Sequence, residues 1–289
     1  MKGIVLAGGK GTRLYPLTLS VSKQLMPIYD KPMIYYPLAT LLAAGIHDIL
    51  IISTPEDLPL FQRLLGDGSR WGCSLRFAEQ PEPKGLAQAF LIGENFIGND
   101  NVALILGDNL FHGSKQLEQL DQNTKLNGGQ IFAYQVKDPQ RYGVVEFDQN
   151  QQAIGLEEKP IQPKSSYAVP GLYLYDNTVV EKAKNLRPSK RGELEITEIN
   201  QQYLVEGKLK VNTLEPGATW LDTGTIESLT AAGQYVQAIQ SRQGVLVGSP
   251  EIAAYRSKAI SKQELQQLAT QQAESDYGKA INAFVSNEH

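Results

Sequence analysis

The sequence is poor in the residues that build several common kinds of site. A single cysteine, Cys73, excludes an internal disulfide and a cysteine metal cluster, which fits a reducing compartment. The three histidines, His47, His112 and His289, are far apart in the sequence and predict no zinc site. No apolar run approaches membrane-spanning length, and the amino terminus lacks the charged and apolar segments of a signal peptide. We therefore expect a cytoplasmic protein without a membrane partner.

The charge balance excludes another class of function. The 289 residues carry a formal net charge of −4, whereas a general nucleic-acid binder presents a basic surface. We expect no nucleic-acid partner, although cations gathered locally can still bind an anionic substrate. The length allows one large domain with an insertion, and a hydrophobic content of 42% is ordinary for a globular protein.

Strand-like and helix-like segments alternate over the first half of the chain. Short apolar runs predict strands over Ile4–Ala7, Ile49–Ile52, Leu75–Ala78, Val102–Leu106 and Ile131–Val136. Between them, apolar spacing predicts helices over Pro37–Ala44, Leu58–Leu65 and Leu86–Ile92, with Ser114 as the cap of a further helix. This alternation predicts an α/β fold with a Rossmann-like, doubly wound, mostly parallel sheet flanked by helices.

The pattern changes after about residue 140. Three expected strands without intervening helices indicate a small antiparallel insertion: Val144–Phe147, Ala153–Leu156 and Leu172–Leu174. The chain then returns to a helix over Leu194–Val205 and a strand over Leu209–Leu214. From Ser228 onward we expect C-terminal helices.

A glycine-rich turn, Gly8-Gly9-Lys10-Gly11-Thr12-Arg13-Leu14, follows the first expected strand. Glycines at the end of a strand place bare backbone N–H groups where a polyphosphate can contact them, and Arg13 and Lys23 supply positive charge. The turn is not the dinucleotide fingerprint, because the third glycine would fall at Leu14, and no Walker motif is present. A tight turn at a sheet edge is the alternative, but the two cations favour phosphate binding.

Two aspartates, Asp108 and Asp222, follow expected strands. Ligands of open α/β sheets bind outside the carboxyl ends of the strands, so both carboxylates are expected at one crevice. Mg²⁺ is commonly held by one or two carboxylates together with substrate phosphates. Each aspartate alone could simply cap a turn, but as a pair beside a phosphate-binding turn they favour a metal site.

Other polar residues leave two interpretations open. Lys159 lies in a charged turn that could be an ordinary surface feature, and Arg191 could bind an anion or start a helix. Gln80 could read the edge of a base, with Gly85 allowing close approach of the backbone, or could be an exposed loop residue. The sequence has no nucleophile elbow, which suits phosphoryl-type transfer because that chemistry depends on positioning and charge.

The combination of these motifs resembles the sugar-1-phosphate nucleotidyltransferases. The turn Gly8–Pro16 with Ser22-Lys23-Gln24 is similar to the signature of that family. Further similar stretches are Lys31–Leu38, Gly85–Phe90, Leu106–Asn109, Arg141–Phe147, Glu157–Pro160, Arg191–Thr197 and Trp220–Thr225. The similarity extends from Lys2 to about Tyr255 and is greatest to the thymidylyl branch of the family.

The resemblance implies a reaction in which dTTP and α-D-glucose 1-phosphate give dTDP-glucose and pyrophosphate. It also implies Mg²⁺ dependence and the first step towards dTDP-L-rhamnose and related deoxysugars. One domain, 1–289, would contain a nucleotide-binding core (1–140), a sugar-phosphate-binding part (141–227) and a helical assembly or regulatory part (228–289). A homotetramer and an end-product inhibitor at a second site are also implied, with Phe111–Gly113, Glu251 and Arg256 as contributors.

The resemblance assigns roles to individual residues of this sequence. Nucleotide binding falls to Gly8, Gly9, Gly11, Thr12, Arg13, Lys23, Gln24, Gln80 and Gly85. Sugar-phosphate binding falls to Asn109, Gly143, Glu158, Lys159, Val169 and Arg191. The catalytic set is Arg13, Lys23, Asp108, Lys159 and Asp222, in which the two aspartates hold the metal.

Two alternatives stay open at this point. Uridylyl or cytidylyl transfer is not excluded by Gln80, because a glutamine amide can present its donor and acceptor in either order. The methyl group that separates thymine from uracil is worth only about 1–3 kcal/mol. A non-catalytic sugar-nucleotide sensor is the second alternative, although such a protein would be expected to have lost a metal aspartate, Arg13 or the sugar-side lysine.

Overall fold

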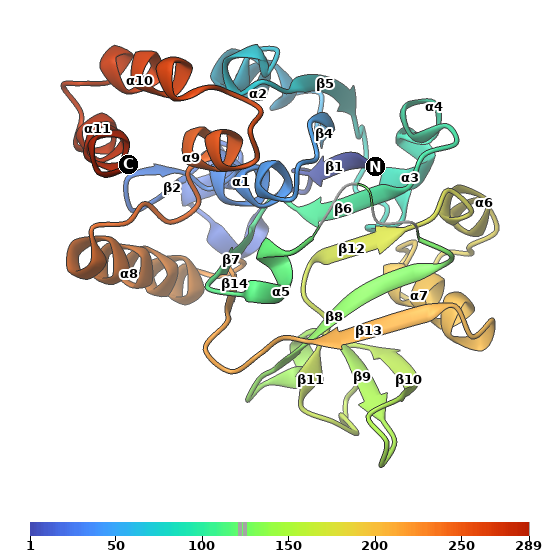
Figure 1. Ribbon diagram of the computed structural model, residues 1–289. Helices are drawn as coiled ribbons and strands as arrows, with labels where there is room; N and C mark the ends of the chain where they lie inside the picture. Colours follow the sequence, from blue (N-terminus) through green and yellow to red (C-terminus); the bar gives the residue numbers. More distant parts are fainter. Residues whose placement is uncertain (121–122, 124–125, 289) are drawn as a thin grey trace.

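A mixed sheet runs through the centre of the computed structural model, and helices cover both of its faces (Figure 1). Over the residues that the structure describes, 1–120, 123 and 126–288, ten strands form this sheet. They are β1 (Lys2–Leu6), β4 (Asp48–Ser53), β5 (Ser74–Glu79), β6 (Val102–Leu106), β8 (Gly129–Gln135), β9 (Gly143–Phe147), β10 (Ala153–Glu158), β11 (Tyr167–Ala168), β12 (Leu172–Tyr175) and β13 (Leu209–Thr213). Their order is β10-β9-β11-β8-β12-β6-β1-β4-β5, with β13 paired to β8.

The parallel core of the sheet consists of β5, β4, β1 and β6. These strands are apolar on both faces because each face is covered by helices. In β1, Ile4 and Leu6 pack into one hydrophobic cluster, whereas Val5 packs into the other. The period-two alternation of side chains thus divides the core into two layers, as the sequence predicts for a doubly wound sheet.

The helices divide between the two layers (Figure 1). One cluster includes buried residues of α1 (Tyr35–Ala43), α2 (Leu58–Leu65), α5 (Lys115–Glu118), α9 (Pro250–Arg256), α10 (Lys262–Gln271) and α11 (Asp276–Asn287). The other includes residues of α3 (Gln88–Ile92), α4 (Glu94–Ile97), α6 (Val179–Lys184) and α7 (Ile196–Val205). A third, smaller cluster joins α8 (Ile226–Gln243) to the segment around β2 (Pro27–Ile28) and β3 (Lys31–Pro32).

Most of the expected elements are confirmed within a few residues. The helix expected over Leu58–Leu65 has those bounds, and Ser114 caps α5 by accepting a hydrogen bond from the Leu117 N–H at 3.3 Å. The expected helix over Leu86–Ile92 begins later, at Gln88, and is followed by α4. Short 3₁₀ turns occur at Thr12–Leu14, Leu17–Leu19, Lys23–Leu25, Ser69–Trp71 and Pro139–Arg141.

The antiparallel strands expected after residue 140 are confirmed, and they extend the main sheet. The strand expected over Leu172–Leu174 lies deepest of these, because β12 is placed between β6 and β8 and is antiparallel to both. Strand β8 therefore runs parallel to the core strands, but it is separated from them by β12. A fully buried strand carries no local signal that identifies its neighbours, because its partners come from distant parts of the chain.

A separate two-stranded ribbon positions the site. Strand β7 (Asn109–His112) continues from the end of β6, and β14 (Thr219–Asp222) pairs with it in antiparallel fashion. In this register Asp222 lies opposite Asn109. The ribbon thus carries Asp222 to the end of β6, beside Asp108.

The C-terminal helices have clear sequence signals for their starts. Thr225 caps α8 and Ser261 caps α10, each by a capping box. Ser249 and Ser275 cap α9 and α11 with their hydroxyl groups. Among the described residues, no helix is long and apolar enough to cross a membrane.

Candidate active site

The glycine-rich turn leaves β1 at the carboxyl edge of the parallel core. Gly9 and Gly11 have φ values of 97° and 58°, a backbone region that favours glycine. Gly11 precedes the 3₁₀ turn Thr12–Leu14, and its carbonyl accepts a hydrogen bond from the Thr18 hydroxyl at 2.8 Å. The turn therefore has a fixed conformation that requires glycine at two positions.

Lys23, Asp108 and Asp222 come together next to this turn. The Lys23 ammonium forms an ion pair with Asp108 Oδ2, and its side chain is only 8% exposed. The Thr223 N–H donates to the Asp108 carbonyl at 3.2 Å, which holds the β14 end against the β6 end. The Arg13 side chain reaches the segment that follows β14, because a Cβ on Gly224 would lie 2.9 Å from Arg13 Nη2.

The two carboxyl groups have opposite pKa shifts. Burial alone would raise the pKa of Asp108, but the Lys23 ammonium, with hydrogen bonds from Lys23 and Asn109, holds it below its usual value. Burial and the neighbouring Asp108 carboxylate raise the pKa of Asp222 above its usual value, despite the opposing cations Lys23 and Arg13. A pair of close carboxylates in which one resists ionisation is an electrostatic arrangement that a cation would relieve.

The donor set of this pair suits a divalent metal that also binds substrate oxygens. Among the described residues, which exclude His289, no group of three or more histidine, cysteine, aspartate or glutamate side chains could hold a metal. Two hard carboxylates are too few for a protein-only cage but match Mg²⁺, which usually keeps waters and phosphate oxygens as ligands.

The Asn109 side chain holds the Asp108 carboxylate by a hydrogen bond. Its Nδ2 donates to Asp108 Oδ1 at 2.9 Å, and its Oδ1 accepts from the Gly171 N–H at 3.0 Å and from Trp220 Nε1 at 2.6 Å. Both ends of the buried amide are thus bound within the protein. The visible role of Asn109 is to orient Asp108, and its expected contact with the sugar stays a prediction.

A cavity of about 190 Å³ opens between the glycine-rich turn and the start of α3. It is lined by Leu6, Gly8, Gly9, Gln24, Gln80, Pro83, Gly85, Leu86, Leu106, Asp108 and Glu193. The lining combines apolar walls with two buried amides, as expected for a pocket that holds a flat, polar-edged group. It brings together five residues that the sequence analysis assigns to nucleotide binding: Gly8, Gly9, Gln24, Gln80 and Gly85.

The structure explains why glycine is required at position 85, and the explanation differs from the one expected from the sequence. Its φ is 105°, and a Cβ there would lie 2.4 Å from the Leu194 carbonyl oxygen. The close approach that requires glycine is therefore an approach to the protein's own backbone. This contact fixes the loop that forms one wall of the cavity.

A second polar cluster lies on the antiparallel strands. A Cβ on Gly143 would be 3.1 Å from Thr197 Oγ1 and 3.3 Å from Glu158 Oε2, with Val169 close by. Thr197 donates its hydroxyl hydrogen to Glu158 Oε2 at 2.6 Å. The structure thus gathers three of the residues expected to meet the sugar, Gly143, Glu158 and Val169. It adds Thr197, which the sequence indicates only as the last residue of the family-like stretch Arg191–Thr197.

Lys159 follows this cluster in a strained conformation. Its φ is 44°, which is unusual for a residue with a side chain, and its N–H donates to the Tyr142 carbonyl at 3.0 Å. The ammonium lies 3.6 Å from Glu158 Oε1, and the side chain is 44% exposed. The positive φ interrupts the extended backbone directly after β10, and the exposure of the side chain leaves its charge accessible.

Arg191 is surrounded by carboxylates. It donates two hydrogen bonds to Glu193, each at 2.9 Å, and reaches Glu195 at 3.3 Å and Glu158 at 3.4 Å. Burial raises the pKa of Glu195, and the nearby Arg191 charge opposes that shift. Because Glu193 lines the cavity and Glu158 lies in the second cluster, Arg191 connects the two regions.

Arg141 is a site residue that sequence reasoning missed. Its Nη1 pairs with Asp138 at 2.9 Å, and its Nη2 lies 3.9 Å from Asp222 Oδ2. These carboxylates raise the pKa of Arg141, and the largest cause is the hydrogen bond that Arg141 donates to Asp138. The sequence did contain a signal for this residue, because Arg141 is the first residue of the family-like stretch Arg141–Phe147.

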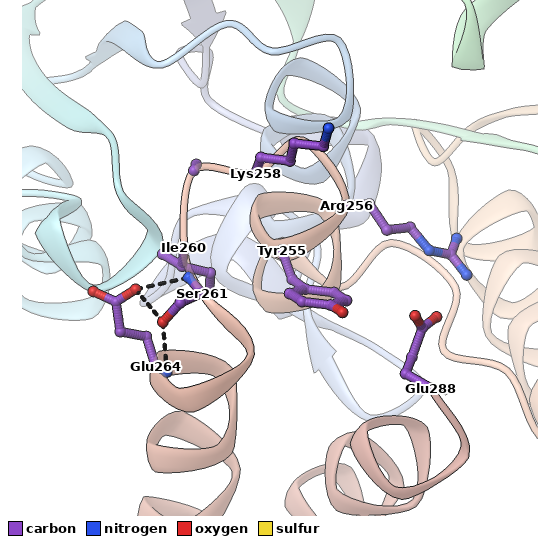
Figure 2. A pocket seen from close by; sticks show the side chains of 8 residues that line it. Tyr255, Arg256, Lys258, Ile260, Ser261, Glu264 and Glu288 are labelled. Atoms are coloured by element: carbon purple, nitrogen blue, oxygen red, sulfur yellow. Dashed lines mark hydrogen bonds between the residues drawn. The ribbon is translucent and has the colours of Figure 1, made fainter.

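The C-terminal helices contain two further cavities. One, of about 310 Å³, is lined by Phe111, His112, Gly113 and Arg256 among others, which are four of the residues expected at a second site. Glu251, the fifth, is buried and instead accepts a hydrogen bond from Ser249 at 3.0 Å. The other cavity, of about 700 Å³, has Arg256 and Glu288 on one side and the α10 capping box, Ser261 and Glu264, on the other (Figure 2).

Known proteins of one family resemble this chain over most or all of its length. A family model described as nucleotidyl transferase matches residues 2–238. The sequence is 56% identical over 288 residues to the glucose-1-phosphate thymidylyltransferase of Mycolicibacterium smegmatis, with 100% of both chains covered. It is 56% identical over 282 residues to the corresponding enzyme of Neisseria meningitidis serogroup A, with 97% of this chain and 98% of the relative covered.

Solved structures show the same fold. A Bacillus anthracis structure in complex with sucrose, named as a glucose-1-phosphate thymidylyltransferase, matches with a TM-score of 0.75 and 44% identity. The match covers 81% of this chain and 94% of that one. A UDP-glucose pyrophosphorylase with UDP-glucose matches with a TM-score of 0.70 over 82% of this chain and 98% of that one, at 23% identity, and shows the fold alone.

Proposed function

Because the chain belongs to the nucleotidyl transferase family and, within it, to the glucose-1-phosphate thymidylyltransferases, we propose that it transfers thymidylate from dTTP to α-D-glucose 1-phosphate. The products are dTDP-glucose and pyrophosphate. The observation that supports the proposal best is the meeting of Lys23, Asp108 and Asp222 beside a glycine-rich turn. It supports the proposal because a triphosphate that lay along the turn would need cations and metal-holding carboxylates beside it. In this proposal the adjoining cavity of about 190 Å³ holds the base, and we call it the base cavity.

The chemistry joins two anions. A phosphate oxygen of glucose 1-phosphate forms a bond to the α-phosphorus of dTTP, the bond from that phosphorus to the β-phosphate oxygen breaks, and pyrophosphate leaves on the opposite side. The main costs are mutual repulsion and misalignment of the reactants, which fixed cations on both sides reduce. No general base is required, because the attacking phosphate is already ionised at neutral pH.

The residues divide these tasks. In this proposal the turn Gly8–Thr12 donates backbone hydrogen bonds to the triphosphate, and Arg13 and Lys23 stabilise the departing pyrophosphate. Lys159 and Arg191 orient the attacking sugar phosphate. Gln80 and Gly85 contact the base, with Gln24 close to the nucleotide.

The sugar and the metal complete the site. Glu158 accepts hydrogen bonds from sugar hydroxyls, beside Asn109, Gly143 and Val169. Asp108 and Asp222 would hold Mg²⁺, which neutralises phosphate charge when bound. We extend the proposal to the entry step of deoxysugar formation, including dTDP-L-rhamnose, and to a cytoplasmic location.

The parts of the chain follow the same division. We propose that residues 1–140 bind the nucleotide, 141–227 bind the sugar phosphate, and 228–289 serve assembly and regulation. The family model ends at residue 238, so α9, α10 and α11 lie outside it, and they line the cavities near Arg256. A homotetramer with an end-product inhibitor at a second site fits that placement.

The test is pyrophosphate release from dTTP, UTP, CTP and ATP, each with glucose 1-phosphate, with and without Mg²⁺. We expect fast, Mg²⁺-dependent release with dTTP and slower release with UTP. Release that is faster with another nucleotide would replace the thymidylyl assignment. No release from a protein that binds dTDP-glucose would favour a sugar-nucleotide sensor.

A further inference from the structure

The two amides in the base cavity differ in how their ends are used. Gln24 donates Nε2 to the Gly8 carbonyl at 3.4 Å, and its Oε1 accepts from the Ser22 hydroxyl at 3.0 Å. Gln80 is 2% exposed, and its Nε2 donates to Gln88 Oε1 at 2.8 Å. Its Oε1 lies on the opposite side, where a Cβ on Gly8 would be only 2.1 Å away. Gln80 therefore turns its oxygen towards the residues that line the cavity.

The orientation of Gln80 is determined by a chain of contacts that ends at the backbone. The Lys84 N–H donates to Gln88 Oε1 at 3.0 Å. A backbone N–H can only donate, so the atom that Gln88 presents to it must be the amide oxygen. That same oxygen accepts from Gln80, which fixes Nε2 of Gln80 on the Gln88 side.

The backbone at the end of this chain is itself held in place. The Leu194 N–H donates to the Lys84 carbonyl at 2.7 Å, and the Ala87 N–H donates to the Leu194 carbonyl at 3.2 Å. Together with the close contact at Gly85, these bonds fasten the loop Lys84–Gln88 to the segment before α7. Lys84 therefore provides a fixed donor.

We propose that Gln88 is a positioning residue that fixes the donor–acceptor order of Gln80 and thereby selects an imide base, thymine or uracil, over cytosine. An imide offers an N3–H donor beside a carbonyl acceptor. Gln80 offers the complementary acceptor through its inward Oε1, and the complementary donor through its second Nε2 hydrogen, which has no partner among the described residues. Cytosine offers the reverse order, an N3 acceptor beside an amino donor, so the locked amide opposes it.

This inference rests on the proposed role of Gln80 in binding the base, and its test keeps the two separable. The comparison is between Gln88→Met, which has a similar length but no amide, and Gln88→Glu, which keeps an oxygen acceptor for both Lys84 and Gln80. Without the acceptor, Gln80 is free to turn its amide and bind cytosine.

The measurement is kcat/KM for dTTP and for dCTP with glucose 1-phosphate, together with the calorimetric affinities for dTDP and dCDP, so that the sugar is the same in each pair. We expect the wild type to favour thymine, Gln88→Glu to keep the thymine-to-cytosine ratio within about threefold, and Gln88→Met to lower that ratio at least tenfold. The KM for glucose 1-phosphate should stay the same in all three proteins.

The inference is overturned if Gln88→Met keeps the wild-type ratio, or if both variants lose the ratio equally, because the effect would then come from packing. A wild type that binds dTDP and dCDP equally also overturns it. A wild type that discriminates between dTDP and dCDP but forms no sugar nucleotide refutes the proposed activity, and the affinity ratios of the two variants still test the inference.

Discussion

The two ends of the candidate site are built in different ways. In the base cavity, Gln80 is almost completely buried and is held by a hydrogen-bond chain through Gln88 to the backbone of Lys84. On the sugar-phosphate side, the side chains of Lys159 and Arg191 are 44% and 40% exposed and pair with carboxylates. Neutral hydrogen bonds fix the side chains of the first region, and a base bound there as proposed would leave them intact. Ion pairs fix the second region, and a phosphate bound there as proposed would share or replace them.

The difference indicates how each region obtains selectivity. A buried, fixed amide rejects the wrong hydrogen-bond pattern strongly, because the mismatch leaves buried polar groups unpaired. Exposed ion pairs are weak and adjustable, so they can exchange a carboxylate for a phosphate at small cost. We therefore expect substitutions in the two regions to alter different kinetic constants.

The largest effect is expected where the two regions meet, at Asp108. Asp108→Asn removes a proposed metal ligand and leaves the buried Lys23 ammonium without its counter-ion. We expect kcat/KM to fall on the order of 10²–10³-fold for both substrates, judged from comparable electrostatic contacts. Arg13→Ala should have a loss of the same size. Steady-state kinetics of both variants checks this, with Asp276→Asn as the control because Asp276 is an exposed aspartate of α11. Normal turnover in Asp108→Asn or in Arg13→Ala would refute the assignment.

The next effect separates the two regions. Lys159→Met should lower kcat/KM for glucose 1-phosphate about 10²-fold while leaving the affinity for dTDP unchanged, because Lys159 is placed on the attacking phosphate. Gln80→Met should weaken dTDP binding by about 1–3 kcal/mol and leave the KM for glucose 1-phosphate unchanged. Lys164→Met, in the same loop as Lys159, is the control. Equal changes in both constants for both variants would show that the regions are not independent.

A smaller effect concerns stability and its dependence on pH. The raised pKa of Asp222 means that the folded protein binds this proton more tightly than the unfolded chain does, so stability falls as pH rises from the usual aspartate value through the raised one. The lowered pKa of Asp108 acts oppositely: its stabilisation is present above the usual aspartate value and is lost as pH falls through the lowered one.

Thermal melts of the metal-free protein at neutral pH test these signs. We expect Asp222→Asn to raise Tm by roughly 2–4 °C, which corresponds to about 1 kcal/mol. Asp108→Asn should lower Tm, because breaking a buried ion pair costs up to about 3–5 kcal/mol. Shifts in the same direction for both variants would contradict the opposite pKa shifts.

The smallest effect is expected at the connection between the regions. Glu193→Gln weakens the two hydrogen bonds that Arg191 donates to Glu193, which would compete with the proposed bonds from Arg191 to the sugar phosphate. Exposed pairs of this kind are worth about 0.2–1 kcal/mol, so the KM for glucose 1-phosphate should fall by no more than about fivefold. Glu206→Gln, which breaks a pair with Lys182 at the far end of α7, should leave the KM unchanged. A higher KM in Glu193→Gln would mean that Glu193 aids sugar-phosphate binding.

Local patterns were enough to predict much of the fold. The apolar helix Leu58–Leu65, the Ser114 cap and the parallel core strands follow from spacing and capping within a few neighbouring residues. The position of β12 between β6 and β8 could not be predicted in this way, because the sequence of a strand buried on both faces does not indicate which strands it pairs with. Register between distant segments is set by tertiary packing.

The same division applies to the site. The glycine-rich turn, its two cations and the two aspartates could be identified from the sequence, because glycines, cations and carboxylates rarely occur together at the ends of expected strands. The roles of Gln88, Thr197 and Arg141 depend on which atom faces which partner. That information appears only when β14, α3 and α7 are brought to the ends of the sheet strands.

The most direct test of the proposed activity follows the attacking oxygen. Glucose 1-phosphate labelled with ¹⁸O at its non-bridging phosphate oxygens is incubated with dTTP and Mg²⁺, and the products are examined by ³¹P NMR and mass spectrometry. We predict that the label is retained in dTDP-glucose, including the oxygen between its two phosphorus atoms, and that the pyrophosphate is unlabelled. Labelled inorganic phosphate, or dTMP formed without dTDP-glucose, would contradict attack of the sugar phosphate on the α-phosphorus.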